Sequence, residues 1–220
     1  MLILDLCGNW QLLALSQEEA NKFSVLELPA KGWIEAKVPG VVQLDLMAAG
    51  KIPDPFFRTN ERSVSWVEDF DWVYKKEFEI RDGVLSKDAV ELIFDGLDTF
   101  ASIWVNGKHV GEAQNMFIQH RFDVKGFLRQ GKNSLIVWFK SPKVVLEERH
   151  SKSDTKLKAA FYPPVVYGRK AQYSFGWDWG PRLPSVGIWK GVRIEALEVA
   201  RIEDVHVRTK LIGEVAKVSI

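Results

Sequence analysis

The chain has 220 residues, of which 46% are apolar and 27% charged, and its formal net charge is +1. Nine Trp and this apolar content are enough for a large core and exclude a disordered chain. Lys and Arg are scattered among Asp and Glu, which excludes the concentrated positive surface of a nucleic-acid binder. No apolar run approaches the roughly 20 residues of a membrane helix, and the start lacks a signal-peptide pattern. We therefore expect a cytoplasmic protein with no nucleic-acid partner and no membrane association.

The first predicted elements are a strand and a short helix. Residues 2–15 read as one strand with a bend at Gly8-Asn9 and with Trp10 in the core. Pro39-Gly40 precedes a predicted amphipathic helix over residues 41–49, which Gly50 ends. The helix would close one open end of a sheet sandwich, and its inner face would carry Val41, Leu44 and Met47.

Residues 52–61, which read I-P-D-P-F-F-R-T-N-E, predict a long irregular segment. Two prolines in this stretch exclude a regular central strand. Long loops inside compact domains are often functional, although Phe56 and Phe57 are expected to be packing residues.

The middle of the chain predicts a series of antiparallel strands. Alternation of apolar and polar residues marks strands near residues 72–80, 89–94, 100–105, 108–112, 118–124 and 134–140. Asn106-Gly107 predicts a tight hairpin, because both central residues of such a turn need a positive φ. His120 falls on an inward-facing position and is expected to be a hydrogen-bonded core residue. The four His share no spacing that suggests a metal site, so we expect neither a metal nor a cofactor.

In the last third of the sequence a predicted helix and loop interrupt the series of strands, which then resumes. Residues 144–160 predict a helix followed by a solvated loop, and residues 187–197 predict another strand. Residues 202–211 and 215–220 predict two new strands, and the second of them runs to the last residue. We therefore expect one domain over residues 1–200 and the truncated start of a second β domain over residues 201–220.

Trp177-Asp178-Trp179-Gly180-Pro181 lies between these elements and is the most unusual stretch of the chain. Gly-Pro continues neither a helix nor a central strand, so the three preceding residues are expected in a loop or at the end of an element. A carboxylate between two indoles suits a sugar, which offers hydroxyls at its rim and C–H groups on its faces. The alternative is that Asp178 caps a turn and both indoles belong to the core.

About eight short strands, one capping helix and no βαβ alternation predict an all-β fold, a jelly-roll β-sandwich. The run from Asp98 to Gly107, D-T-F-A-S-I-W-V-N-G, resembles the N-terminal sugar-binding domain of glycoside hydrolase family 2, which is galactose-binding-domain-like. Two further runs resemble the β-mannosidase branch of that family: residues 52–57 with Asn60-Glu61 and Asp71-Trp-Val-Tyr74, and Arg169 to Pro181. The resemblance covers residues 1–200, and 201–220 would open an immunoglobulin-like β-sandwich domain.

The resemblance implies a multidomain, exo-acting, retaining enzyme that removes terminal non-reducing β-D-mannose. Its catalytic residues would be two Glu on a TIM-barrel domain of the same chain, so no catalytic residue is assigned within these 220 residues, and the fragment alone should be inactive. By the same resemblance Asp178, Trp177 and Trp179 would contact the terminal sugar, and Arg169 and Arg182 would orient Asp178.

Other interpretations stay open. The chain could be a free-standing carbohydrate-binding module, since a jelly roll rich in Trp suits that role too. It could also belong to a family 2 glycosidase of different sugar specificity, such as an exo-glucosaminidase. Asp98 and Asn106 are expected to be turn and hairpin residues.

Overall fold

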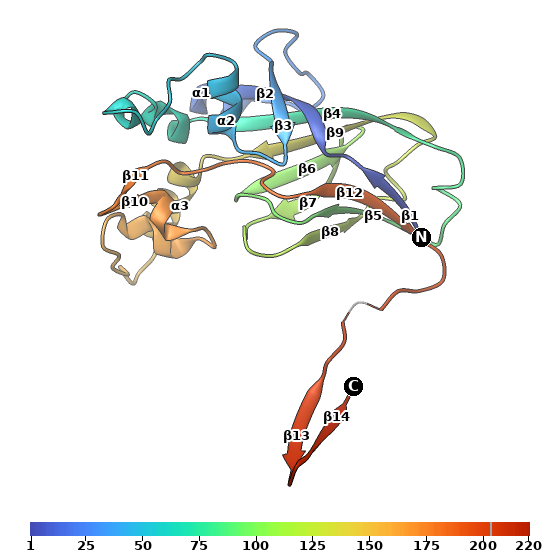
Figure 1. Cartoon of the computed structure of the whole chain (residues 1–220). Helices are drawn as coiled ribbons and strands as arrows, with labels where there is room; N and C mark the ends of the chain where they lie inside the picture. Colours follow the sequence, from blue (N-terminus) through green and yellow to red (C-terminus); the bar gives the residue numbers. More distant parts are fainter. Residues whose placement is uncertain (203) are drawn as a thin grey trace.

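The computed structural model describes residues 1–202 and 204–220. Two antiparallel sheets face each other, which confirms the predicted all-β sandwich (Figure 1). The six-stranded sheet has the order β3-β2-β4-β9-β6-β7 and the four-stranded sheet the order β1-β12-β5-β8. Their bounds are β1 Leu2–Asp5, β2 Gly8–Leu15, β3 Ile34–Val38, β4 Asp71–Ile80, β5 Ala89–Phe94, β6 Ala101–Val105, β7 Lys108–Ala113, β8 His120–Asp123, β9 Gly131–Phe139 and β12 Val192–Leu197.

The main core lies between the two sheets. Buried aromatic and branched side chains of β2 and β4 meet those of β5 and β12 there, among them Leu12, Tyr74, Phe94 and Ile194. β4 carries the alternation predicted from its sequence: Phe78 and Ile80 are buried, whereas Glu77 and Glu79 are exposed. The hydrophobic effect acting on this interface fixes the register of both sheets, because a slip by one residue would turn every apolar side chain outward.

The N-terminal strand prediction was wrong in one respect. Residues 2–15 form two strands, β1 and β2, which belong to different sheets. The Asp5 carboxylate accepts a hydrogen bond of 2.9 Å from the Cys7 backbone N–H, and Gly8 adopts a φ of 94°. This local turn lets the chain cross from one sheet to the other while Leu6 stays buried.

Two short helices border the six-stranded sheet. The sequence prediction missed α1 (Gln17–Lys22), although Ser16 and Glu19 form a capping box at its start. The predicted helix at residues 41–49 is α2 (Val42–Ala48), but its buried face was assigned wrongly. Leu44 is 59% exposed, whereas Val42 and Leu46 are buried. The buried face also holds Gln43 and Asp45, which an apolar pattern cannot reveal. Gln43 Nε2 donates to the Pro184 carbonyl oxygen, and the Asp45 carboxylate accepts a hydrogen bond from the Lys37 backbone N–H.

The Asn106-Gly107 turn between β6 and β7 is confirmed, with φ values of 51° and 77°. The strand predicted over residues 118–124 begins only at His120, and two of its residues lie outside the core, since Ile118 is exposed and His120 is half-buried. His120 Nε2 lies 2.8 Å from the Asn115 carbonyl oxygen, so its ring has a hydrogen-bond partner, as expected.

The other elements that precede β12 gather at one end of the sandwich. They are η1 (Asn60–Arg62), η2 (Ser65–Asp69), α3 (Pro142–Lys152), η3 (Pro163–Tyr167), η4 (Gln172–Ser174), β10 (Phe175–Trp177) and β11 (Gly180–Arg182). Figure 1 shows α3, β10 and β11 together at the end away from the N-terminus. The prediction that Phe56 and Phe57 are packing residues was wrong, because both side chains are exposed.

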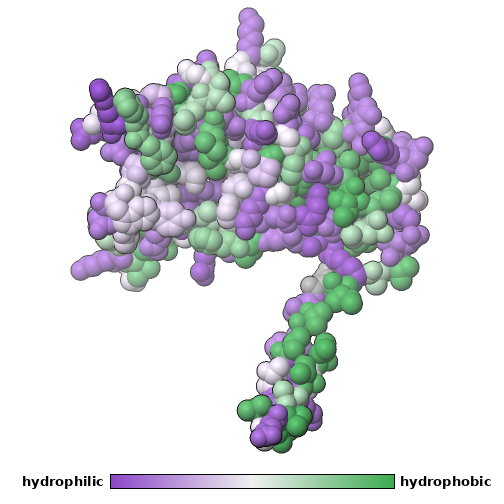
Figure 2. Space-filling model, in the orientation of Figure 1, coloured by the Kyte–Doolittle hydropathy of each residue, from purple (hydrophilic) through white to green (hydrophobic). Residues whose placement is uncertain are grey.

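The chain leaves the sandwich after β12 and ends in a separate hairpin of β13 (Arg208–Ile212) and β14 (Val215–Ser219). The strand predicted over residues 202–211 therefore begins later, and residue 203 of that prediction lies outside the described residues. Every side chain of this hairpin is exposed, and Figure 2 shows that much of its surface is hydrophobic. The proposed domain boundary at residue 200 stays a prediction.

Candidate functional site

The W-D-W stretch forms the tip of a small hairpin. Phe175 pairs with Arg182 and Trp177 with Gly180, so Asp178 and Trp179 form the connection between β10 and β11. The position predicted for these residues, at the end of an element, is therefore confirmed.

All three predicted sugar-contacting side chains are exposed. Trp177 is 44% and Trp179 76% exposed, and Asp178 between them is exposed too. Two indoles with this exposure are not core residues, so that part of the alternative interpretation was wrong. Trp177 rests on the Phe161 ring at a centroid distance of 5.2 Å. The contact with sugar stays a prediction.

Arg182 holds the base of this hairpin. Its Nε lies 3.2 and 3.0 Å from the two carboxylate oxygens of Glu68, and its Nη2 lies 3.0 Å from Oε2. The guanidinium also lies over the rings of Tyr162, at 4.4 Å, and Phe175, at 5.2 Å. The two rings are stacked with centroids 4.9 Å apart. β11 is thus fixed to η2 and to the segment after α3 by charge and by aromatic contact together.

The two arginines predicted to orient Asp178 therefore lie in different settings. The Arg182 guanidinium donates hydrogen bonds to the Glu68 carboxylate and to the Phe175 carbonyl oxygen. Arg169 is exposed and its carbonyl accepts a 3.0 Å hydrogen bond from Met116 N. The structure brings Arg182 into the hairpin base and places Arg169 on a backbone bridge to Asn115. Their orienting role stays a prediction.

The hollow found beside the hairpin tip is too small for a sugar. The crevice between Trp177 and residues 159–165 has a volume of about 10 Å³. Small-molecule sites usually have volumes of roughly 300–1,000 Å³. The tip is one exposed wall, and a pocket there would need a second surface facing it.

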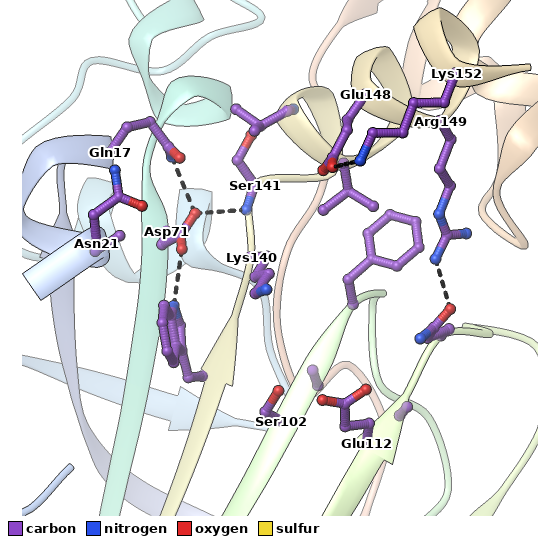
Figure 3. A pocket seen from close by; sticks show the side chains of 18 residues that line it. Gln17, Asn21, Asp71, Ser102, Glu112, Lys140, Ser141, Glu148, Arg149 and Lys152 are labelled. Carbon is purple, nitrogen blue, oxygen red and sulfur yellow. Dashed lines mark hydrogen bonds and ion pairs between the residues drawn. The ribbon is translucent and has the colours of Figure 1, made fainter. Parts of the chain in front are cut away.

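A larger groove, of about 460 Å³, lies elsewhere, between α1 and α3 over the outer face of β6 and β9 (Figure 3). No residue of the W-D-W hairpin lines it. Its polar groups are largely engaged with one another: the Asp71 carboxylate accepts three hydrogen bonds, and Glu148 pairs with Lys152 at 2.5 Å. The Asp71 donors are Gln17 Nε2, Trp138 Nε1 and the Ser141 backbone N–H. These contacts explain the groove as part of the packing of α1 and α3 on the sheet.

The sequence analysis missed a buried ion pair behind the hairpin. Asp98, predicted to be a turn residue, is 1% exposed and pairs with Lys170, which is also buried. The only available signal was that Lys170 lies inside the run from Arg169 to Pro181 and Asp98 opens the other quoted run. Asn106 is a hairpin residue as expected, and its side chain also binds Asn133 and the Phe127 carbonyl.

Two further features of the described residues bear on function. Their helices are all too short or too polar to cross a lipid bilayer. They also contain no group of three or more His, Cys, Asp or Glu side chains arranged to share a metal ion.

Comparison with known proteins relates the chain to glycosidases. The family described as "Glycosyl hydrolase 2 galactose-binding domain-like" matches residues 10–190. β-Mannosidase of Mus musculus is 38% identical over 208 residues, which cover 90% of this chain and 22% of that protein. β-Mannosidase B of Aspergillus clavatus is 39% identical, over 80% of this chain and 21% of that protein.

A solved structure gives the same relation. The crystal structure of β-D-mannosidase from Dictyoglomus thermophilum superposes with a TM-score of 0.90 and 47% identity, over 99% of this chain and 25% of that one. The chain thus spans a fifth to a quarter of the length of the relatives it matches.

Proposed function

The chain belongs to glycosyl hydrolase family 2, as its galactose-binding-like domain, and from this we propose that it is the N-terminal domain of an exo-acting, retaining β-mannosidase. The whole protein would hydrolyse terminal non-reducing β-D-mannose. This domain would supply the scaffold and one wall of the sugar pocket. The observation that carries the proposal is the exposed W-D-W tip on a firmly attached hairpin.

The chemistry of the tip suits a sugar. The Asp178 carboxylate would accept hydrogen bonds from two neighbouring hydroxyls of the terminal mannose. The Trp177 indole, supported from behind by Phe161, would present a flat apolar face to the C–H groups of the ring. Trp179 would extend this wall. A wall that closes one end of the binding site favours a pocket that takes the end of a sugar chain over an open cleft that binds its middle.

The reaction itself needs groups from outside this domain. A retaining glycosidase uses two carboxylates about 5–5.5 Å apart, one as nucleophile and one as acid and base. We propose that a catalytic TIM-barrel domain of the same protein supplies both, and that this domain alone has no activity.

The end of the sandwich that carries the hairpin would face the catalytic domain. Several of the exposed aromatic side chains come from segments of this end: Phe56, Phe57, Phe161, Tyr173, Trp177 and Trp179. Figure 1 shows the segment before β4 and the β10–β11 hairpin at the same end. Exposed apolar patches of this kind commonly mark an interface.

The test is a panel of aryl glycosides given to the full-length protein and to the isolated domain. We expect the full-length protein to cleave the β-mannoside far faster than the β-glucosaminide or β-glucuronide, and the isolated domain to cleave none. Preference for the glucosaminide would assign a different sugar specificity. If the isolated domain bound mannose as tightly as the full-length protein, the chain would be a carbohydrate-binding module.

A further inference from the structure

Asp98 and Lys170 form an ion pair in the interior of the domain. The Lys170 ammonium lies 2.6 and 2.7 Å from the two carboxylate oxygens of Asp98 and 2.6 Å from the Ser185 carbonyl oxygen. The side chains of Lys170 and Asp98 are 0% and 1% exposed. The three acceptors match the three N–H donors of the ammonium, so the charge is fully hydrogen-bonded.

The same carboxylate joins both ends of one segment. Lys170 stands at the start of the segment that carries the W-D-W hairpin, and Ser185 stands at its end. The Ser185 hydroxyl donates to Asp98 Oδ2 at 2.5 Å. Two backbone hydrogen bonds between Asp98 and Gly187, of 2.9 and 3.0 Å, reinforce the contact. Asp98 itself comes from the connection between β5 and β6, so it ties residues 171–186 to the sandwich.

Stability alone explains this pair poorly. Removing two charges from water is expensive, and a well-packed apolar pair of similar volume is often as stabilising or more so. Burial lowers the pKa of Lys170 below its usual value, and the Asp98 carboxylate acts against that shift. The ion pair differs from an apolar pair in its directed hydrogen bonds, which define one position for each end of the segment.

We propose that Asp98 and Lys170 are positioning residues for the sugar-facing hairpin, acting through residues 171–186 on Asp178. This inference rests on the proposed function of Asp178. The Arg182–Glu68 contact fixes the hairpin at its base, and the Asp98–Lys170 pair fixes the two ends of the segment that carries it. The exposed tip between these two points then keeps a defined place without packing into the core.

The test replaces the pair in the full-length protein by an apolar one, Asp98→Leu with Lys170→Met. A milder variant, Ser185→Ala, removes only one hydrogen bond to Asp98. A control, Val90→Ala, destabilises the buried part of β5 away from the segment. Hydrogen exchange of peptides from residues 171–186 is measured beside kcat/KM for an aryl β-mannoside.

We expect the double variant to exchange these amides at least tenfold faster and to lose tenfold or more in kcat/KM. Ser185→Ala should show a smaller change in the same direction, and it decides the matter if the double variant does not fold. Val90→Ala should lower the melting temperature and change neither readout. In an Asp178→Ala background the double variant should cause no further loss of kcat/KM.

Unchanged exchange in residues 171–186, or an equal further loss in the Asp178→Ala background, would overturn the positioning role. Failure of the proposed function gives a different result, since Asp178→Ala alone would then have wild-type kinetics. In that case the exchange measurement still decides whether the pair holds the segment.

Discussion

Replacing Arg182 by Met removes the guanidinium that fixes the sugar-facing hairpin while keeping the apolar stem. The Glu68 side chain, which is 9% exposed, would then keep the more distant Lys143, whose Nζ lies 3.7 Å from Oε1. Breaking a fully buried ion pair costs about 3–5 kcal/mol. Because the Arg182 side chain is 33% exposed, solvent screening reduces this to about 1–2 kcal/mol.

Loss of the contacts with the Tyr162 and Phe175 rings adds about 0.5–1 kcal/mol. The total of about 1.5–3 kcal/mol corresponds to a decrease in melting temperature of roughly 3–12 °C for a chain of this size. Thermal unfolding followed by circular dichroism measures it. Glu68→Gln completes a double-mutant cycle, in which we expect the two substitutions together to cost clearly less than their sum. A decrease below roughly 2 °C, or additive effects, would refute the assigned role of Arg182.

Four further substitutions test the packing of α2 and the residues beside it. Gly187→Ala would place a Cβ 2.7 Å from the Gly40 carbonyl oxygen, so we expect a loss of about 1–3 kcal/mol in urea unfolding, and an unchanged midpoint would contradict that close approach. Leu46→Ala should cost about 2–5 kcal/mol and Leu44→Ala less than about 0.5 kcal/mol, and the reverse order would mean that α2 presents its other face. Burial raises the pKa of Asp45, so the folded state holds this proton to higher pH than the unfolded state. The free energy of unfolding should therefore fall as the pH rises above the unfolded-state pKa of 3.8, and then level off. Asp45→Asn should lack this pH dependence, and identical pH profiles for the two proteins would contradict the effect of burial.

The strands of the sandwich were predictable where one face packs into the core and the other faces water. In β4 the alternation of Phe78 and Ile80 with Glu77 and Glu79 follows directly from the two faces of the sheet. The Asn106-Gly107 turn was predictable because few residues accept its backbone angles. In both cases the information is local to the sequence.

The errors arose where contacts distant in sequence decide the outcome. Asp98 reads as a turn residue until Lys170 and Ser185 are placed against it. The buried face of α2 holds Gln43 because the Pro184 carbonyl accepts its hydrogen bond, and no periodicity records that partner. Buried polar residues whose hydrogen-bond partners lie far away in the sequence therefore cannot be predicted from the spacing of apolar residues.

The candidate site was predictable in part. The unusual composition of the W-D-W stretch indicated a sugar-facing loop, and its exposure agrees with a surface role. The anchors of that loop were not predictable, since Glu68 is separated from Arg182 by 114 positions in the sequence.

The most direct measurement compares the full-length protein with its Asp178→Ala and Asp178→Asn variants on an aryl β-mannoside. A hydrogen bond to a charged group contributes roughly 1.5–3 kcal/mol, so the account predicts a loss in kcat/KM of about ten- to a hundredfold for Asp178→Ala, with an unchanged melting temperature. Asp178→Asn, which keeps one acceptor oxygen, should lose less. Wild-type kcat/KM in both variants would contradict the account and leave the W-D-W hairpin without a role in binding the sugar.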